Sequence, residues 1–289
     1  MEFAKFKGLV EKMASEDNYN VNQIQALISS CYEYIQIPYI IAPQEFVVRC
    51  SKNEPGEIFK NVSRCSYNPN TKKIPLQRCN YKEQQAFYCS MFSDTDYATT
   101  TITCLVETAW DYIENYGLSY SFFTLSRWPL KRHMTLWALP FSELGCLRNR
   151  DFKKIRDDIE TKMKGQPGNI NETIDYLQYM SDVFCKRENK KKYYKISSAF
   201  FNYLLLHRQD KNLSFDGLVY PSANTEGAGM NVAIRKELID DRILNCDLAT
   251  VWVMIRNPND NKRLTTYPIS NNSTVSKDGG FYFIPKSNH

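Results

Sequence analysis

The sequence predicts an α+β fold, in which helices and strands are mixed without the regular alternation of a doubly wound sheet. Three observations support this prediction. Residues 1–37 carry apolar side chains at helical spacing. Two short β-like runs, residues 45–50 and 85–90, are followed by a helical pattern at 98–116. From residue 215 onward the pattern returns to short strands separated by turn-forming residues.

The N-terminal segment has the pattern of an amphipathic helix. Asn20 stands immediately before its second half, where an N-cap is expected. The preferred interpretation is a helix packed on the rest of the domain, and the alternative is a helix that binds a partner. The apolar residues that repeat at helical spacing are Val21, Ile24, Leu27, Ile28, Cys31 and Ile35.

The centre of the chain combines a long loop with two strands. Residues 51–84 are rich in Asn, Pro, Lys and Ser, which indicates a loop, and long loops in compact domains are often functional. Residues 118–128 and 132–139 alternate well enough to form two strands, and we expect Pro129 in the turn between them.

The following region is predicted to be mainly helical. A charged, periodic helix covers 151–164, the segment GQPGN at 165–169 breaks it, and a second helix covers 171–186. The apolar segment 198–207 reads as a buried helix. Between these helices lies the basic run RENKKKYYK, residues 187–195, which we interpret as a solvated turn.

The C-terminal part predicts strands and contains no internal repeat. Strand-like segments occur at FDGLVY (215–220), MNVAI (230–234) and ATVWVMI (249–255), and a last strand is expected at 280–284.

Composition restricts the classes of function. The net charge of +5 suits an anionic small ligand but falls short of a dedicated nucleic-acid binder. The nine cysteines contain no C-x-x-C pair, so they predict free, mostly buried thiols in a reducing cytosol and give no support to a zinc site. The N-terminus has no signal-peptide pattern and no stretch has the length of a membrane span, so a cytoplasmic location is expected.

The sequence offers more arginines than histidines as candidate functional residues. No phosphate-binding P-loop, dinucleotide-binding or metal-protease motif occurs, and with only three histidines a Ser–His–Asp or metal mechanism has little material. Arg49, Arg64 and Arg78 each precede a cysteine in or beside the long loop. Because a guanidinium presents a rigid fork that suits phosphate, these arginines either bind a pyrophosphate or are ordinary surface residues.

Two further residues are candidates for a site. Glu107 lies between apolar neighbours in CLVETAW, so its carboxylate borders a buried face and serves either a structural ion pair or a site. Ser222 follows a strand that ends at Pro221, where ligand contacts are common, although Pro-Ser is also good chemistry for an ordinary turn.

Four segments together resemble the RES family of NAD phosphorylases, named for its arginine, glutamate and serine. The resemblance covers roughly residues 45–256, and the four segments occur in the family's order. They are EFVVRC (45–50), QRCNYKEQQAFYCS (77–90), CLVETAW (104–110) and FDGLVYPSANTEGAGMNVAI (215–234).

The resemblance implies roles for individual residues, with Arg64 competing with Arg49 for the first family arginine. Cys79 stands where the family often has tryptophan, and the spacing from Tyr88 to Glu107 is longer than the family pattern, which indicates an insertion. The implied catalytic residues are Arg49, Arg78, Tyr88, Glu107 and Ser222, and the implied NAD-binding residues are Arg49, Arg78, Tyr88, Ser222 and Asn231.

The resemblance also implies a fold and an activity. The implied fold is that of ADP-ribosyltransferases, a mixed split sheet with surrounding helices. Residues 1–44 would be an added N-terminal helical extension and residues 45–289 the catalytic domain, with a helical insertion around 140–197. The substrate would be NAD+ and the co-substrate inorganic phosphate, without a metal, giving nicotinamide and ADP-ribose 1″-phosphate.

Members of this family are commonly toxins held by an Xre-type antitoxin, so an antitoxin partner is implied, with nucleic acid bound only through that complex. Two alternatives remain open. The chain would be an ADP-ribosyltransferase that modifies a protein or nucleic acid, or a non-catalytic nucleic-acid-binding protein that uses the basic run.

Overall fold

A computed structural model describes most of the chain and confirms the α+β prediction, because helices and strands are mixed along it without βαβ alternation. The described residues are 2–31, 38–41, 45–91, 97–116, 119–164, 170–207, 215–257 and 259–286.

Within these residues ten strands form one sheet. Their hydrogen-bond order is β1-β5-β6-β7-β3-β2-β4-β8-β10, and β9 pairs with β8. β5 and β6 are parallel, whereas the other paired strands are antiparallel. The bounds are β1 (Pro38–Ile41), β2 (Phe46–Lys52), β3 (Ala86–Met91), β4 (Tyr120–Pro129), β5 (Met134–Ala138), β6 (Gly217–Pro221), β7 (Met230–Arg235), β8 (Leu248–Asn257), β9 (Asp260–Pro268) and β10 (Ser273–Thr274).

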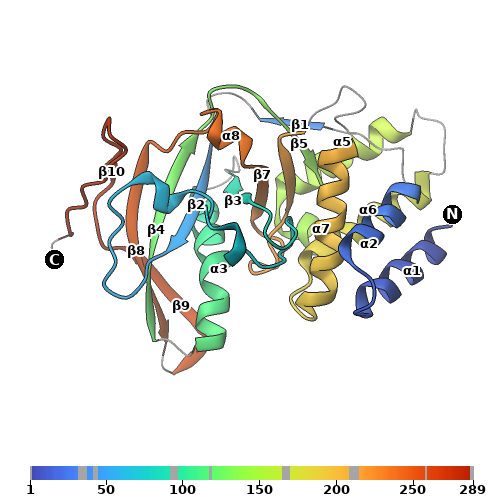
Figure 1. Cartoon of the computed structure of the whole chain (residues 1–289), viewed down its shortest axis with the longest axis horizontal. Coiled ribbons are helices and arrows are strands. Elements are labelled where there is room, and N and C mark those ends of the chain that lie inside the picture. The colour runs from blue at the N-terminus through green and yellow to red at the C-terminus, as the bar shows by residue number, and fades with distance from the viewer. Residues whose placement is uncertain are drawn as a thin grey trace.

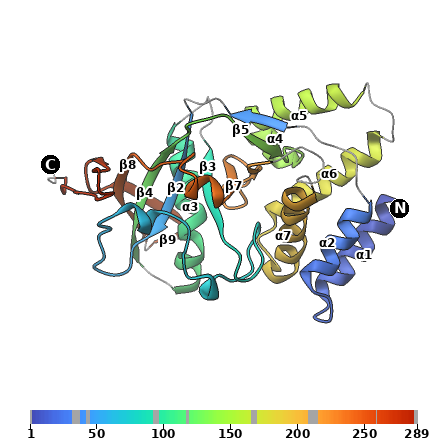
Figure 2. The same cartoon turned by 45° about the horizontal axis from the view of Figure 1, so that its top comes forward.

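The helices gather mainly at one end of the molecule. In both views α1, α2, α6 and α7 lie together at the end opposite β8 and β10, and α7 stands between α2 and the sheet (Figure 1, Figure 2). The bounds are α1 (Phe3–Ser15), α2 (Val21–Cys31), α3 (Tyr97–Tyr116), α4 (Glu143–Arg148), α5 (Arg150–Met163), α6 (Ile170–Cys185), α7 (Lys190–His207) and α8 (Glu237–Asp240), with 3₁₀ turns at Val62–Cys65 and Thr71–Lys73 in the long loop.

The N-terminal helices pack on the domain, as the first interpretation of their pattern predicts. Asn20 caps α2: its Oδ1 accepts from the Gln23 amide at 3.0 Å, and its own amide donates to Gln23 Oε1 at 2.9 Å, a reciprocal capping box. Phe6 and Ile24 are completely buried in the same core as α6 and α7. Residues 32–37 lie outside the described residues, and β1 adds a strand to the segment predicted as a helical extension.

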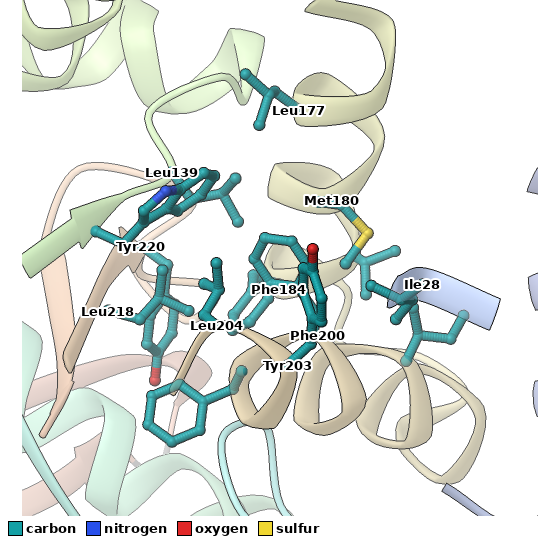
Figure 3. Close-up of a cluster of buried hydrophobic side chains, with 14 of the residues drawn as sticks. Ile28, Leu139, Leu177, Met180, Phe184, Phe200, Tyr203, Leu204, Leu218 and Tyr220 are labelled. Carbon is teal, nitrogen blue, oxygen red and sulfur yellow. The ribbon is translucent and has the colours of Figure 1, made fainter. Parts of the chain in front are cut away.

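A core of aromatic and aliphatic side chains fixes α6 and α7 on the sheet. Phe184 of α6 and Phe200 of α7 point towards Leu218 and Tyr220 of β6 (Figure 3). The rings of Phe184 and Tyr220 lie 4.9 Å apart between centroids. Burying side chains of this size contributes roughly 1.5–3 kcal/mol each, so this core holds α6 and α7 firmly against β6.

The pairing between β2 and β3 is short. This pair shares two residue pairs, Val47↔Met91 and Val48↔Ser90, whereas β2 and β4 share seven. Beyond these pairs the guanidinium of Arg49 reaches across and donates from Nη1 to the Tyr88 carbonyl at 2.5 Å. Arg49 therefore satisfies a backbone acceptor that a continued ladder would have paired.

Three predictions of local structure are wrong, each because of a tertiary contact. The basic run 187–195 is not a turn, since α7 begins within it at Lys190. Pro129 ends β4, paired with Phe46, instead of lying in a hairpin turn, because β4 and β5 pair with different strands. Residues 280–284 form no strand: Gly280 makes one isolated bridge to Asn61.

Other predictions agree with the structure or lie outside it. The strands predicted at 45–50 and 85–90 and the helices at 151–164 and 171–186 are confirmed within a few residues. The predicted break at 165–169 lies outside the described residues. The eight cysteines whose side chains the structure describes are free, and six of them are buried. No helix among the described residues has the length and apolarity to cross a bilayer.

Lys195 ties the turn between α1 and α2 to α7. Its side chain is 8% exposed, and Nζ donates to the carbonyls of Glu16 at 2.9 Å and Tyr19 at 3.3 Å. A buried ammonium is destabilising unless it is hydrogen-bonded, and the two carbonyls would lose this donor if the ammonium were removed.

We expect Lys195→Met to lower the free energy of unfolding by about 1.5–3 kcal/mol, because it removes charge-assisted hydrogen bonds while keeping the apolar stem. Urea denaturation measures the change. Lys191→Met is the matched control: Lys191 pairs with Asp17 and both side chains are largely exposed, so its loss should have little effect. Equal stability of the two variants would contradict this role of Lys195.

Candidate active site

The centre of the site is the carboxylate of Glu107 on α3, which is half-buried and held at both oxygens. Ser222 Oγ donates to Oε1 at 2.5 Å, and the Asn224 amide donates to the same oxygen at 3.2 Å. Asn224 Nδ2 donates to Oε2 at 3.0 Å. These uncharged donors fix the position of the carboxylate.

The donors to Glu107 come from the tight loop between β6 and β7. Ser222 is completely buried, and its amide donates to the Gly229 carbonyl at 2.9 Å. The Ser222 hydroxyl also accepts from the Thr225 amide at 3.1 Å, and the Ser222 carbonyl accepts from the Gly227 amide at 2.8 Å. Because each backbone group is used within the loop, the hydroxyl has a fixed position.

Two glycines let this loop fit between α3 and α4. Gly227 has φ +85°, and a Cβ there would lie 2.6 Å from the Cα of Gly145 on α4. A Cβ on Gly229 would lie 1.9 Å from Thr103 Oγ1 on α3. No larger residue fits at either position without moving a helix.

Two arginines, Arg187 in the turn between α6 and α7 and Arg78 in the loop before β3, brace the site. Arg187 donates to the carbonyls of Ala223 at 2.9 Å and Asn224 at 2.7 Å, so it clamps the β6–β7 loop. Arg78, which is 9% exposed, donates to the carbonyls of Phe184 at 2.6 Å and Lys186 at 2.9 Å. Together the two guanidinium groups connect this turn to the loop that carries Arg78 and to the β6–β7 loop.

Each arginine also stacks on an aromatic ring. The guanidinium carbon of Arg187 lies 4.9 Å from the ring centroid of Trp110, and that of Arg78 lies 5.3 Å from Tyr194. Burial opposes the charged form of Arg78, but its neighbours Tyr194 and Glu107 outweigh burial and raise the pKa of the guanidinium. Arg78 therefore stays cationic inside the protein.

These side chains enclose a cavity of about 100 Å³. Pockets that hold a whole drug-sized ligand measure roughly 300–1,000 Å³, so this one accommodates only the reacting part of a larger ligand. The lining carries three cationic side chains, one carboxylate and two aromatic rings. Its residues are Arg78, Glu107, Trp110, Arg187, Lys190, Tyr194 and Asn224.

The structure brings three of the residues singled out from the sequence together. Glu107 and Arg78 line the cavity, and Ser222 holds the carboxylate. Tyr88 lies one step behind Arg78: its hydroxyl donates to Asn80 Oδ1 at 2.7 Å and accepts from the Cys79 amide at 2.8 Å. Burial raises the pKa of the Tyr88 hydroxyl well above its usual value, so it remains a neutral hydrogen-bonding group that shapes the Arg78 loop.

The other predicted site residues lie outside the cavity lining. Arg49 spans the gap between β2 and β3, with its guanidinium 4.8 Å from the ring centroid of Phe87. Asn231 is buried in β7, where its Oδ1 lies 3.4 Å from Ser90 Oγ. Arg64 forms a half-exposed ion pair with Glu57 at 2.8 Å and does not line this pocket.

Five lining residues were not identified as candidates from the sequence, although each had a signal. Trp110 follows Glu107 by three positions, and residues at that spacing share a helix face. Asn224 lies two residues after Ser222. Arg187, Lys190 and Tyr194 belong to the basic run 187–195, whose interpretation as a solvated turn concealed them.

Comparisons with protein-family models, with curated proteins and with solved structures find no match to this chain. Among the described residues, no group of three or more His, Cys, Asp or Glu side chains is arranged to hold a metal ion. The geometry of the pocket and the order of the sequence motifs are therefore the grounds for assigning a function.

We expect Gly227→Ala to destabilise the protein more than Gly56→Ala. Both glycines have positive φ, +85° and +77°, so both substitutions cost about 1–2 kcal/mol for the left-handed backbone. Only at Gly227 does the added Cβ meet a helix, since nothing lies within 4 Å at Gly56. Overpacking there should add about 1–3 kcal/mol, measured by urea denaturation. Equal losses would show that the loop does not press on α4.

Proposed function

We propose that this protein is an NAD+-degrading enzyme that cleaves the bond between nicotinamide and ribose, with inorganic phosphate as the acceptor. The observation that carries the proposal is the Glu107 carboxylate, fixed at both oxygens by Ser222 and Asn224 inside a pocket of cations and aromatic rings.

The carboxylate suits the charge that this reaction develops. As the bond from ribose to nicotinamide breaks, the ribose acquires positive charge, and a fixed negative group beside it lowers the barrier. Glu107 is held in place by uncharged donors, so its carboxylate needs no rearrangement when the ribose charge appears. One of its oxygens can also accept from a ribose hydroxyl.

The cations suit the anionic groups that take part in the reaction, whether the pyrophosphate of NAD+ or the phosphate acceptor. Three cationic side chains line the cavity against one carboxylate. A guanidinium has five N–H donors, and backbone carbonyls take two of them at Arg78 and two at Arg187. Carbonyls leave the positive charge uncompensated, so each arginine retains both charge and donors for an anionic ligand.

The aromatic residues and the size of the cavity suit one end of a dinucleotide. Trp110 and Tyr194 offer flat surfaces for a ring such as nicotinamide. A cavity of about 100 Å³ takes that end only, and the remainder of the dinucleotide would lie outside it.

An ADP-ribosyltransferase-like fold is supported by the mixed sheet and by its narrowing between β2 and β3, next to the helix that carries Glu107. A role as a toxin held by an Xre-type antitoxin, in the cytoplasm, is supported by the order of the four sequence motifs.

We expect Glu107→Gln to reduce the rate of NAD+ loss by about 10²–10³, because it replaces the stabilising charge by a neutral amide of the same shape. The rate is measured by chromatography of nicotinamide released by the purified chain in phosphate buffer. Glu226→Gln is the matched control, since Glu226 lies in the same β6–β7 loop but pairs with Arg148 on the surface.

Three results would count against the proposal. A folded Glu107→Gln protein with unchanged rate would remove Glu107 from the chemistry. Absence of NAD+ loss by the unmodified chain would remove the activity. Transfer of label from NAD+ into protein or nucleic acid, instead of small products, would favour an ADP-ribosyltransferase.

A further inference from the structure

The basic residues at the start of α7 divide between two faces. Lys192 contacts Glu11 of α1 at 3.3 Å, and Lys195 holds the turn that follows α1. Lys190 and Tyr194, four residues apart and thus on one helix face, line the cavity instead. Lys190 therefore does not belong to the clamp on the N-terminal helices.

Arg187 and Lys190 differ from Arg78 in their setting. Arg78 is 9% exposed and lies beneath the α6–α7 turn, with its guanidinium stacked on Tyr194. Arg187 and Lys190 are half-buried and line the same cavity. Arg187 is also close to the carboxylate, because it bonds the carbonyl of Asn224, whose side chain bonds Glu107.

We propose that Arg187 and Lys190 form the binding subsite for free inorganic phosphate; this rests on the proposed function. In the reaction a phosphate oxygen forms a bond to the ribose carbon C1″ while the bond from C1″ to the nicotinamide nitrogen breaks. The electron pair of that bond stays on the ring nitrogen, so nicotinamide leaves as a neutral molecule. No electron acceptor is needed, and the phosphate proton passes to solvent.

The position of the subsite favours the acceptor over the pyrophosphate of NAD+. The acceptor attacks the carbon whose charge Glu107 stabilises, so its site must share the cavity with Glu107. The pyrophosphate is separated from that carbon by the ribose. Lys190 supplies a compact charge and Arg187 a planar fork of donors, and the two positive charges together outweigh the repulsion between phosphate and one carboxylate.

Direct binding tests the subsite without any turnover. The melting temperature of the full chain is measured in increasing potassium phosphate, against potassium chloride of equal ionic strength. We expect phosphate to stabilise the unmodified chain and Lys191→Gln alike, since Lys191 points to Asp17 and away from the cavity. Lys190→Gln should weaken phosphate binding about tenfold or more, the effect of losing one charged contact.

Kinetics with NAD+ then distinguish the two phosphate sources. A raised phosphate KM in Lys190→Gln with an unchanged NAD+ KM supports the subsite. A parallel rise of the NAD+ KM assigns Lys190 to the pyrophosphate and overturns it, as does a phosphate-induced shift that is absent in the unmodified chain or equal in all three proteins. If NAD+ is not consumed, the proposed function fails, while the melting experiment still decides whether the phosphate subsite exists.

Discussion

The short contact between β2 and β3 is the constraint on which the site depends. Two residue pairs join the halves of the sheet there, and Arg49 supplies one further bond across the gap. α3 packs beside this contact, with the Cys104 thiol donating to the Val48 carbonyl of β2 and Thr100 Oγ1 to the Met91 carbonyl of β3. α3 therefore helps to connect the two halves of the sheet. The same helix carries Glu107, which bonds to the β6–β7 loop. Arg49, which the sequence predicts to be a site residue, thus has a structural role: it connects β2 to β3.

The pocket is built jointly by the sheet and by the helices that follow β5. The sheet side provides Glu107 and the loop that holds it, and the turn between α6 and α7 provides Arg187 and Lys190. Arg78 connects the two sides through the carbonyls of that turn. The same α7 that lines the pocket also holds the N-terminal helices, so α7 connects these helices to the site.

Sequence patterns predicted most elements because periodicity and capping are local: Asn20 lies before α2 and caps it. Glu107 and Ser222 were also identifiable, since a carboxylate among apolar residues and a serine after a strand are visible in the chain. Strand order and the convergence of Arg187 and Lys190 on Glu107 were not. They depend on contacts between residues far apart in sequence, and a basic run gives no indication of which of its side chains face inward.

The central claim is that this pocket breaks the bond between nicotinamide and ribose. Phosphorus and proton magnetic resonance on one sample of the unmodified chain with NAD+ and phosphate test it most directly. The account predicts that nicotinamide protons shift to those of the free base while a new phosphate monoester resonance grows at the same rate. Intact NAD+ after prolonged incubation with folded protein would contradict the account, and free nicotinamide without the new resonance would contradict phosphate as the acceptor.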